Sequence, residues 1–368
     1  MLVFTIAFFI AVAIQIAFFA AFLIAFTRKK EKGNASEPVS IVICAHDEID
    51  NLRELIPLLM EQDYPDFEII IVNDRSNDET FDYLLQETRV NSRVRMVKID
   101  NLPAHVNGKK YALTLGIKAA KYETILLTDA DCRPATNQWI RTLAAELTTS
   151  ATFVVGYSPY TVNPGFLNRF IRFEALVTAI QYVGLAILKK PYMGVGRNLA
   201  YRKSFFLEKK GFNHLLHITG GDDDLFVNQY ATGLNTVAVS GTDALVYSIP
   251  KTTLKSYLRQ KVRHLSVGKL YHFKDRLLLG LFVITWIASW FAGLPLLVAS
   301  LYSTLVYYIL GALVLRIIML ILTTHYASKN LGDKFEAWPV VVLDFLYSIY
   351  YISTGVITLL TKKVQWRN

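Results

Sequence analysis

The sequence predicts an α/β domain with a mostly parallel sheet, held between membrane-spanning helices at both ends of the chain. Strand-like and helix-like segments alternate from Pro38 onward, which is the pattern of βαβ units. Residues 2–26 carry no charge and are long enough to cross a bilayer. From about residue 277 to residue 360 the chain is again mostly apolar. We therefore expect one α/β domain between two membrane regions.

The composition agrees with this division. Of the 368 residues, 53% are hydrophobic and 19% are charged, and the mean hydropathy is +0.32. These values are too apolar for an ordinary water-soluble protein and too charged for a wholly embedded one. We expect a transmembrane helix over 1–27, a central domain over 28–276 and about three transmembrane helices within 277–368. The last three are expected near 277–299, 303–322 and 339–360, with a break over 323–338. A cleaved signal peptide is the alternative for 2–26, but no basic segment precedes the apolar one.

Basic residues flank the central domain on both sides, within a formal net charge of +9. The positive-inside rule therefore predicts a multi-pass protein of the inner (cytoplasmic) membrane, with its central domain in the cytosol. Clusters beside apolar spans favour anionic lipid over a nucleic-acid partner. The basic residues at the C-terminal end of the chain do not fit the positive-inside rule, since four spans would put them on the outer side of the membrane. The flanking residues are Arg28, Lys29, Lys30 and Lys32, then Lys251, Lys255, Arg259, Lys261, Arg263, Lys269, Lys274 and Arg276, and the disagreeing ones are Lys362, Lys363 and Arg367.

The central domain begins with a β-branched strand and continues as alternating helices and strands. Segments 166–188 and 251–276 mix apolar and basic residues, which predicts helices at the membrane interface. Cys44 and Cys132 have no metal-type spacing and are expected to be reduced core thiols. The predicted elements, in order, are a strand at 39–44, a helix at 50–61, a strand at 67–72, a helix at 78–86, a strand at 93–98, a helix at 109–121 and a strand at 124–127.

The last of these strands ends in two carboxylates, Asp129 and Asp131. Ligands of open α/β sheets bind at the carboxyl ends of strands. Two hard oxygen donors there suit a divalent cation that also binds phosphate oxygens, namely Mg²⁺ or Mn²⁺. A solvated turn is the alternative for this pair alone. No glycine-rich dinucleotide fingerprint or phosphate loop follows the first strand, which disfavours a dehydrogenase or a P-loop ATPase.

An ordered set of motifs resembles the family 2 glycosyltransferases. They are the segment 40–52, the strand end at Asp74, the Gly-Lys-Lys at 108–110, Asp129-Ala-Asp131, the Asp-Asp-Asp-Leu at 222–225 and the Gln-x-x-Arg-His at 260–264. The resemblance covers about 38–264 and implies a GT-A fold that binds a nucleotide sugar. With the apolar segments, it is similar to membrane synthases of polysaccharides or glycolipids.

The resemblance implies roles for the residues at the strand ends. Asp74, Glu48 and the backbone near Ala45 would bind the nucleoside, and Lys109 would contact the diphosphate. Asp131 would bind the cation directly, and Asp129 would contact the cation and the donor. For Asp74 alone, a turn or helix-cap role is the alternative. Lys109 is equally compatible with a solvated helix start.

The acidic run supplies the candidate general base. Alignment of its Asp-Leu with the family pattern assigns this role to Asp222, with Asp223 in reserve, although Gly221 stands where a Glu is usual. Repulsion among three adjacent carboxylates should raise the pKa of at least one, which suits a base. Residues expected near the acceptor or the diphosphate are Gln260, Arg263, His264, Arg197 and Asn198, with His264 standing where the family has Trp.

The expected activity is inverting transfer of a sugar from a nucleotide diphosphate donor, by resemblance a UDP-sugar, to a lipid or lipid-linked acceptor. Few spans disfavour the alternative, a polysaccharide synthase with a polymer channel. A nucleotide-binding scaffold without catalysis and a transporter with a regulatory domain are further alternatives. Arg316 and Asp344 lie within predicted spans, where charged side chains are costly, and we expect them to pair.

Overall fold

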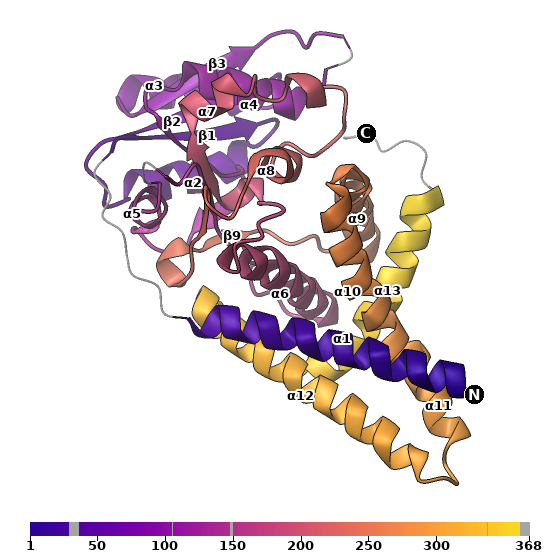
Figure 1. Ribbon diagram of the computed structural model, residues 1–368. Helices are drawn as coiled ribbons and strands as arrows, with labels where there is room; N and C mark the ends of the chain where they lie inside the picture. The colour runs from indigo at the N-terminus through magenta and orange to yellow at the C-terminus, as the bar shows by residue number, and fades with distance from the viewer. Residues whose placement is uncertain (29–36, 105, 148–149, 337, 361–368) are drawn as a thin grey trace.

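The computed structural model describes residues 1–28, 37–104, 106–147, 150–336 and 338–360 (Figure 1). The predicted basic positions Lys29, Lys30, Lys32, Lys362, Lys363 and Arg367 lie outside these ranges.

The central domain is built on a seven-stranded sheet with the order β3-β2-β1-β4-β7-β6-β8. Parallel pairs join β1 to β2 and β4, β2 to β3, and β6 to β8, while β7 is antiparallel to both of its neighbours. The mostly parallel sheet is therefore confirmed. A second, two-stranded sheet pairs β5 (Cys132–Pro134) with β9 (Val246–Ser248). The main strands are β1 (Val39–Ala45), β2 (Phe67–Asp74), β3 (Val94–Ile99), β4 (Thr124–Leu127), β6 (Phe153–Val155), β7 (Leu199–Arg202) and β8 (Thr236–Ala238).

Helices cover both faces of this sheet (Figure 1). The continuous β-branched and leucine runs of β1, β2 and β4 are buried, as expected of strands covered on both sides. One helix lies especially close: a Cβ at Gly116 would approach Cγ1 of Val42 to 2.6 Å. Only glycine fits there, and α4 therefore packs directly on β1. The domain helices are α2 (Ile49–Met60), α3 (Thr80–Val90), α4 (Gly108–Ala119), α5 (Trp139–Ala144), α6 (Phe166–Ile187), α7 (Lys203–Glu208), α8 (Asp224–Tyr230) and α9 (Leu254–Val267).

Five helices among the described residues are long and apolar enough to cross a membrane. Four coincide with predicted spans: α1 (Leu2–Thr27), α10 (Phe273–Phe291) continued by α11 (Gly293–Ala299), α12 (Leu305–Leu331) and α13 (Val340–Leu360). The fifth is α6, expected at the membrane interface. It is mostly buried, packing against α1, α12, α13 and β8 (Figure 1).

The predicted break after residue 322 is wrong, because α12 continues to Leu331. The hydroxyls of Thr323 and Thr324 donate to the carbonyls of Met319 and Leu320, within the helix. Their polarity is therefore satisfied without unwinding it. The helix ends at Gly332, whose φ of +83° is the left-handed conformation of a C-terminal cap.

The expected pair between membrane helices is present. Arg316 of α12 donates two hydrogen bonds to Asp344 of α13, from Nη1 to Oδ2 at 2.6 Å and from Nη2 to Oδ1 at 3.1 Å. Both side chains are fully buried. Nε1 of Trp290 donates to the same carboxylate at 3.1 Å, and the ring of Trp286 lies 5.0 Å from the guanidinium. A charge pair with this geometry fixes α12 against α13 and α10.

The apolar helices are joined to the central domain at the end of α12. A Cβ at Gly332 would lie 2.3 Å from the backbone N of Thr242, so α12 ends in direct contact with the 241–242 turn. Asp333 follows, 3.6 Å from Arg172 of α6, and accepts a hydrogen bond from the Tyr157 hydroxyl at 3.2 Å. The sheet domain and α12 are thus held together by buried polar contacts.

Candidate active site

Three of the predicted residues meet at one edge of the sheet because their strands are parallel neighbours. Ala45 ends β1 and pairs with Asn73, Asp74 ends β2, and Asp129 follows β4. The Asp74 carboxylate is oriented by Nε of Arg75, 2.8 Å away. A Cβ at Gly108 would approach Oδ2 of Asp74 to 3.0 Å. The start of α4 therefore lies directly against the predicted nucleoside site.

Glu48 lies at the first turn of α2, on the same edge. Its backbone N–H donates to Oγ1 of Thr80 at 3.1 Å, and its carboxylate accepts from Nδ2 of Asn51 at 2.7 Å. Here the structure assigns Glu48 a role in joining α2 to α3, beside its predicted role in nucleoside binding.

Lys109, at the start of α4, connects two carboxylates that are far apart in the sequence. Its Nζ lies 2.9 Å from Oδ1 of Asp129 and 3.3 Å from Oδ2 of Asp222. Burial alone would disfavour the ammonium, but Asp129, Asp222 and Asp223 raise the pKa of Lys109 well above its usual value. The alternative of a solvated helix start is excluded by these contacts, since only 20% of this side chain is exposed.

Of the two carboxylates that follow β4, that of Asp131 is the less well supplied with hydrogen bonds. Burial and the neighbouring charge of Asp129 raise its pKa, against the opposing effect of Arg197 and Lys109. Its one hydrogen bond given by the structure comes from the weak donor Sγ of Cys132 at 3.6 Å.

Two close carboxylates with little hydrogen bonding fit a divalent cation. In the described part of the chain no group of three or more His, Cys, Asp or Glu side chains could hold a metal alone. The donor set therefore fits Mg²⁺ or Mn²⁺ sharing its coordination with substrate phosphates, which is the usual arrangement for such ions.

The acidic run divides into three different environments. Asp222 is buried beside Lys109, and although burial opposes it, Lys109 and Lys110 lower its pKa. Asp223 caps α8, accepting from the backbone N–H groups of Gly196 at 2.6 Å and Asp224 at 2.8 Å. Asp224 accepts from the Tyr271 hydroxyl at 2.7 Å, and burial, then the charge of Asp223, raises its pKa to about 8.

Burial, together with repulsion among the carboxylates, raises the pKa values of Asp223 and Asp224, which confirms that at least one is raised, whereas the pKa of Asp222 is lowered. The reason is the pair of lysines at 109 and 110, which the sequence places more than a hundred residues away. Asp222 is therefore ionised at every physiological pH.

Lys110 is a residue to which the sequence reasoning gave no role. It is fully buried, and its Nζ donates to the carbonyl of Ile218 at 2.6 Å and to that of Gly220. These contacts hold the turn that carries Asp222. The only sequence signal was the lysine's place in the Gly-Lys-Lys segment.

Arg197 and Asn198, predicted near the acceptor, separate in function. The guanidinium of Arg197 lies 4.7 Å from the ring centroid of Tyr160 and acts on the Asp131 carboxylate. Asn198 is fully enclosed: it donates to the carbonyls of Tyr157 and Ala244 at 2.7 Å and accepts from Trp139 Nε1 at 3.0 Å. These core bonds engage both ends of its amide, so Asn198 has a structural role, and its place near the acceptor stays a prediction.

The Gln-x-x-Arg-His segment lies on α9. Burial lowers the pKa of Arg263, and the negative charges of Asp222 and Asp129 oppose that effect. His264 is reached by solvent, yet the surrounding protein and the cations Arg263 and Lys261 lower its pKa well below the usual value. The imidazole is therefore neutral. Oε1 of Gln260 is buried without a hydrogen-bond donor among the described residues.

Carboxylates at the carboxyl edge of a parallel sheet, a lysine that bridges two acidic segments and a basic helix opposite them are the features expected of a GT-A site. Residues 40–208 match the family model described as glycosyl transferase family 2. These residues form a family 2 glycosyltransferase domain.

Curated relatives agree with this assignment. A poly-β-1,6-N-acetyl-D-glucosamine synthase of Staphylococcus epidermidis is 32% identical over 103 residues, which are 28% of this chain and 24% of the relative. An uncharacterised glycosyltransferase of Synechocystis is 40% identical over 96 residues, 25% of this chain and 29% of the relative. The alignments thus span only 24% and 29% of the length of these two relatives.

One solved structure is similar over almost the whole chain. The mannosyltransferase PcManGT from Pyrobaculum calidifontis, in complex with GDP-Man and Mn²⁺, superposes with a TM-score of 0.61 and 18% identity. The match covers 96% of this chain and 99% of that one. The likeness therefore extends over the membrane helices as well as the GT-A domain.

Proposed function

We propose that this protein is an inverting, cation-dependent glycosyltransferase. It would move a sugar from a nucleotide diphosphate donor to a lipid or lipid-linked acceptor at the cytoplasmic face of the inner membrane. The observation that carries the proposal is the position of Lys109, whose ammonium contacts both Asp129 and Asp222. It brings the strand-end carboxylates and the candidate base within reach of one reacting centre.

The donor would lie along the carboxyl edge of the sheet. Asp74, with Glu48 and the backbone of Ala45, would bind the nucleoside. Asp129 and Asp131 would hold Mg²⁺ or Mn²⁺, which when bound supplies positive charge against the leaving diphosphate. Lys109 and Arg263 would add positive charge on the same side. Uridine is the nucleoside expected from the resemblance, while the similar mannosyltransferase was solved with GDP-Man and Mn²⁺.

Asp222 is the proposed general base, in preference to Asp223. Both oxygens of Asp223 already accept backbone N–H groups, whereas Asp222 is ionised and faces Lys109. The acceptor hydroxyl oxygen would attack the anomeric carbon as its proton passes to Asp222. The bond to the diphosphate breaks, and the electron pair leaves with the diphosphate. Attack from the opposite side gives inversion without a covalent protein intermediate.

The acceptor would enter beside α9. The unpartnered Oε1 of Gln260 needs a hydrogen-bond donor, and an acceptor hydroxyl supplies one. The neutral His264 could accept or donate such a bond, but it offers less stacking surface than a Trp. A polysaccharide synthase is the second candidate, because several curated relatives carry that description.

The test uses the full chain in nanodiscs with UDP- and GDP-sugars, Mn²⁺ or Mg²⁺, and extracted bacterial lipids. Nucleotide diphosphate release and the lipid products are followed together. We expect release with one donor, abolished by chelation, and a glycolipid of inverted anomeric configuration. A soluble polymer as sole product would favour the synthase alternative. Metal-dependent nucleotide binding without turnover of any donor would refute the transferase and leave a scaffold.

A further inference from the structure

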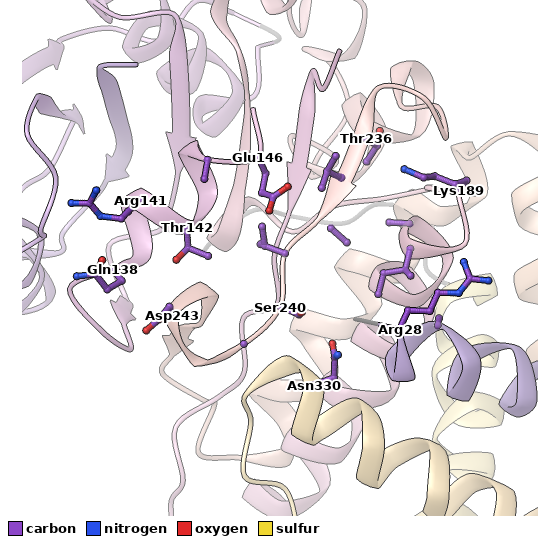
Figure 2. A pocket seen from close by; sticks show the side chains of 18 of the residues that line it. Arg28, Gln138, Arg141, Thr142, Glu146, Lys189, Thr236, Ser240, Asp243 and Asn330 are labelled. Atoms are coloured by element: carbon purple, nitrogen blue, oxygen red, sulfur yellow. The ribbon is translucent and has the colours of Figure 1, made fainter. Parts of the chain in front are cut away.

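A cavity of about 680 Å³ lies away from the candidate active site, at the junction of the membrane helices and the catalytic domain. Its volume is in the range of ligand-binding pockets. Figure 2 shows its polar side chains, which come from the end of α1, the end of α6, the end of α12 and the α5–β8 side of the domain. No residue assigned to donor, cation or acceptor binding lines it.

The cavity lies where two apolar helices end. Thr27 is the last residue of α1 and Arg28 follows it, while Asn330 lies one residue before the end of α12. Both helices are long and apolar enough to cross a membrane. The pocket is therefore at the level of the lipid headgroups. Ala186 and Ile187 give its lining an apolar portion.

The lining holds three cations, Arg28, Arg141 and Lys189, and two carboxylates, Glu146 and Asp243. Arg141 is paired with Asp63 at 3.3 Å, and Asp243 accepts from the Thr136 hydroxyl at 3.1 Å. In contrast, the side chains of Arg28 and Lys189 have no hydrogen bond or ion pair with any described residue. Two cations are thus left to face a ligand.

A second observation also indicates a ligand. Oδ1 of Asn330 is buried without a hydrogen-bond partner among the described residues, and the Asn330 side chain points into the cavity in Figure 2. A buried acceptor without a donor is costly. A ligand that carries a hydroxyl group next to a phosphate would satisfy both the cations and this oxygen.

We propose that this cavity binds the headgroup of an anionic phospholipid, with its phosphate between Arg28 and Lys189 and a headgroup hydroxyl donating to Asn330. Basic pockets between membrane helices on the cytoplasmic side suit such headgroups. A bound lipid bridges α1, α6 and α12, and so holds the catalytic domain at a fixed height on the membrane.

The test measures binding of phosphatidylglycerol to the purified full chain by native mass spectrometry, with phosphatidylcholine, glycerol 3-phosphate and inorganic phosphate as comparison ligands. Binding needs no donor sugar, so its outcome is independent of the proposed transferase activity. The variants are the double Arg28→Gln/Lys189→Gln and, as a matched control, Lys274→Gln, a membrane-proximal lysine outside the cavity. Ser240→Trp fills the cavity and leaves its charges unchanged.

We expect the double variant to bind phosphatidylglycerol about 30-fold more weakly, from two lost basic contacts. Ser240→Trp should lose binding as well, and Lys274→Gln should keep it. If the double variant melts at a lower temperature than wild type, its loss of binding no longer reports on the two charges alone. The binding affinity of Ser240→Trp is then the test of the proposal. Unchanged affinity in the cavity-filled variant, or equal losses in Lys274→Gln, would overturn the proposal. Equal binding of inorganic phosphate would indicate a free anion site and would also overturn it.

Discussion

The buried pair between α12 and α13 allows a quantitative prediction. Arg316→Met leaves the Asp344 carboxylate buried, with Trp290 as its one remaining side-chain donor among the described residues. Asp344→Leu leaves the guanidinium among the rings of Phe19 and Trp286. Both charges are fully enclosed and joined by two hydrogen bonds. Removing one partner should therefore cost about 3–5 kcal/mol, since the other charge stays buried without compensation.

The double variant Arg316→Met/Asp344→Leu should be more stable than either single variant, because no unpaired charge remains in it. Each single variant should lower the apparent melting temperature in nanodiscs by roughly 6–10 °C. Lys329→Met is the control: this exposed lysine lies on the same helix and should change stability by no more than about 0.5 kcal/mol. Additive losses in the double variant would refute the reasoning, because additivity means that the two charges do not depend on each other.

Three further predictions concern the parts that hold the site. Gly332→Ala should lower the free energy of unfolding by about 2 kcal/mol or more, because φ is left-handed there and the added Cβ would lie 2.3 Å from the backbone N of Thr242. The control is Gly311→Ala, which has open space around it and should leave the melting temperature in nanodiscs unchanged or raise it. The pKa of Asp224 is raised to about 8 in the folded protein, so the free energy of unfolding should fall as the pH rises from the unfolded-state pKa of 3.8 to about 8. Asp224→Asn should flatten this dependence on pH. An unchanged slope would contradict the raised pKa of Asp224. Lys110→Met should lower kcat about 100-fold with little change in donor KM, by releasing the turn that carries the base, and an unchanged kcat would show that the lysine has no positioning role.

Much of the fold could be predicted because its elements carry strong local patterns. The strand at 124–127 has the same bounds in the structure, and the uncharged run of α1 was recognisable from length alone. Element ends were harder. The helix predicted from residue 78 begins at Thr80, because the Asp78 carboxylate accepts from the Thr80 amide before the first turn. The burial of α6 depends on tertiary contacts that a mixed apolar and basic sequence does not reveal.

The candidate site was predictable where residues stand at strand ends or in a motif. The electrostatics of the site could not be predicted from the sequence. The pKa of Asp222 depends on Lys109 and Lys110, which reach it only through folding. Asn198 stood in a motif-like segment, but its amide is bonded to Trp139 and to two distant carbonyls, a pattern with no sequence signature.

The central claim is that Asp222 is the general base of a centre that also contains Asp129 and Lys109. Its most direct test is the rate of nucleotide diphosphate release under single-turnover conditions, with donor affinity measured separately, for wild type, Asp222→Asn and the exposed control Asp100→Asn. We predict that Asp222→Asn binds the donor normally and reacts at least about 100-fold more slowly, while Asp100→Asn reacts like wild type. A wild-type rate in Asp222→Asn would contradict the claim.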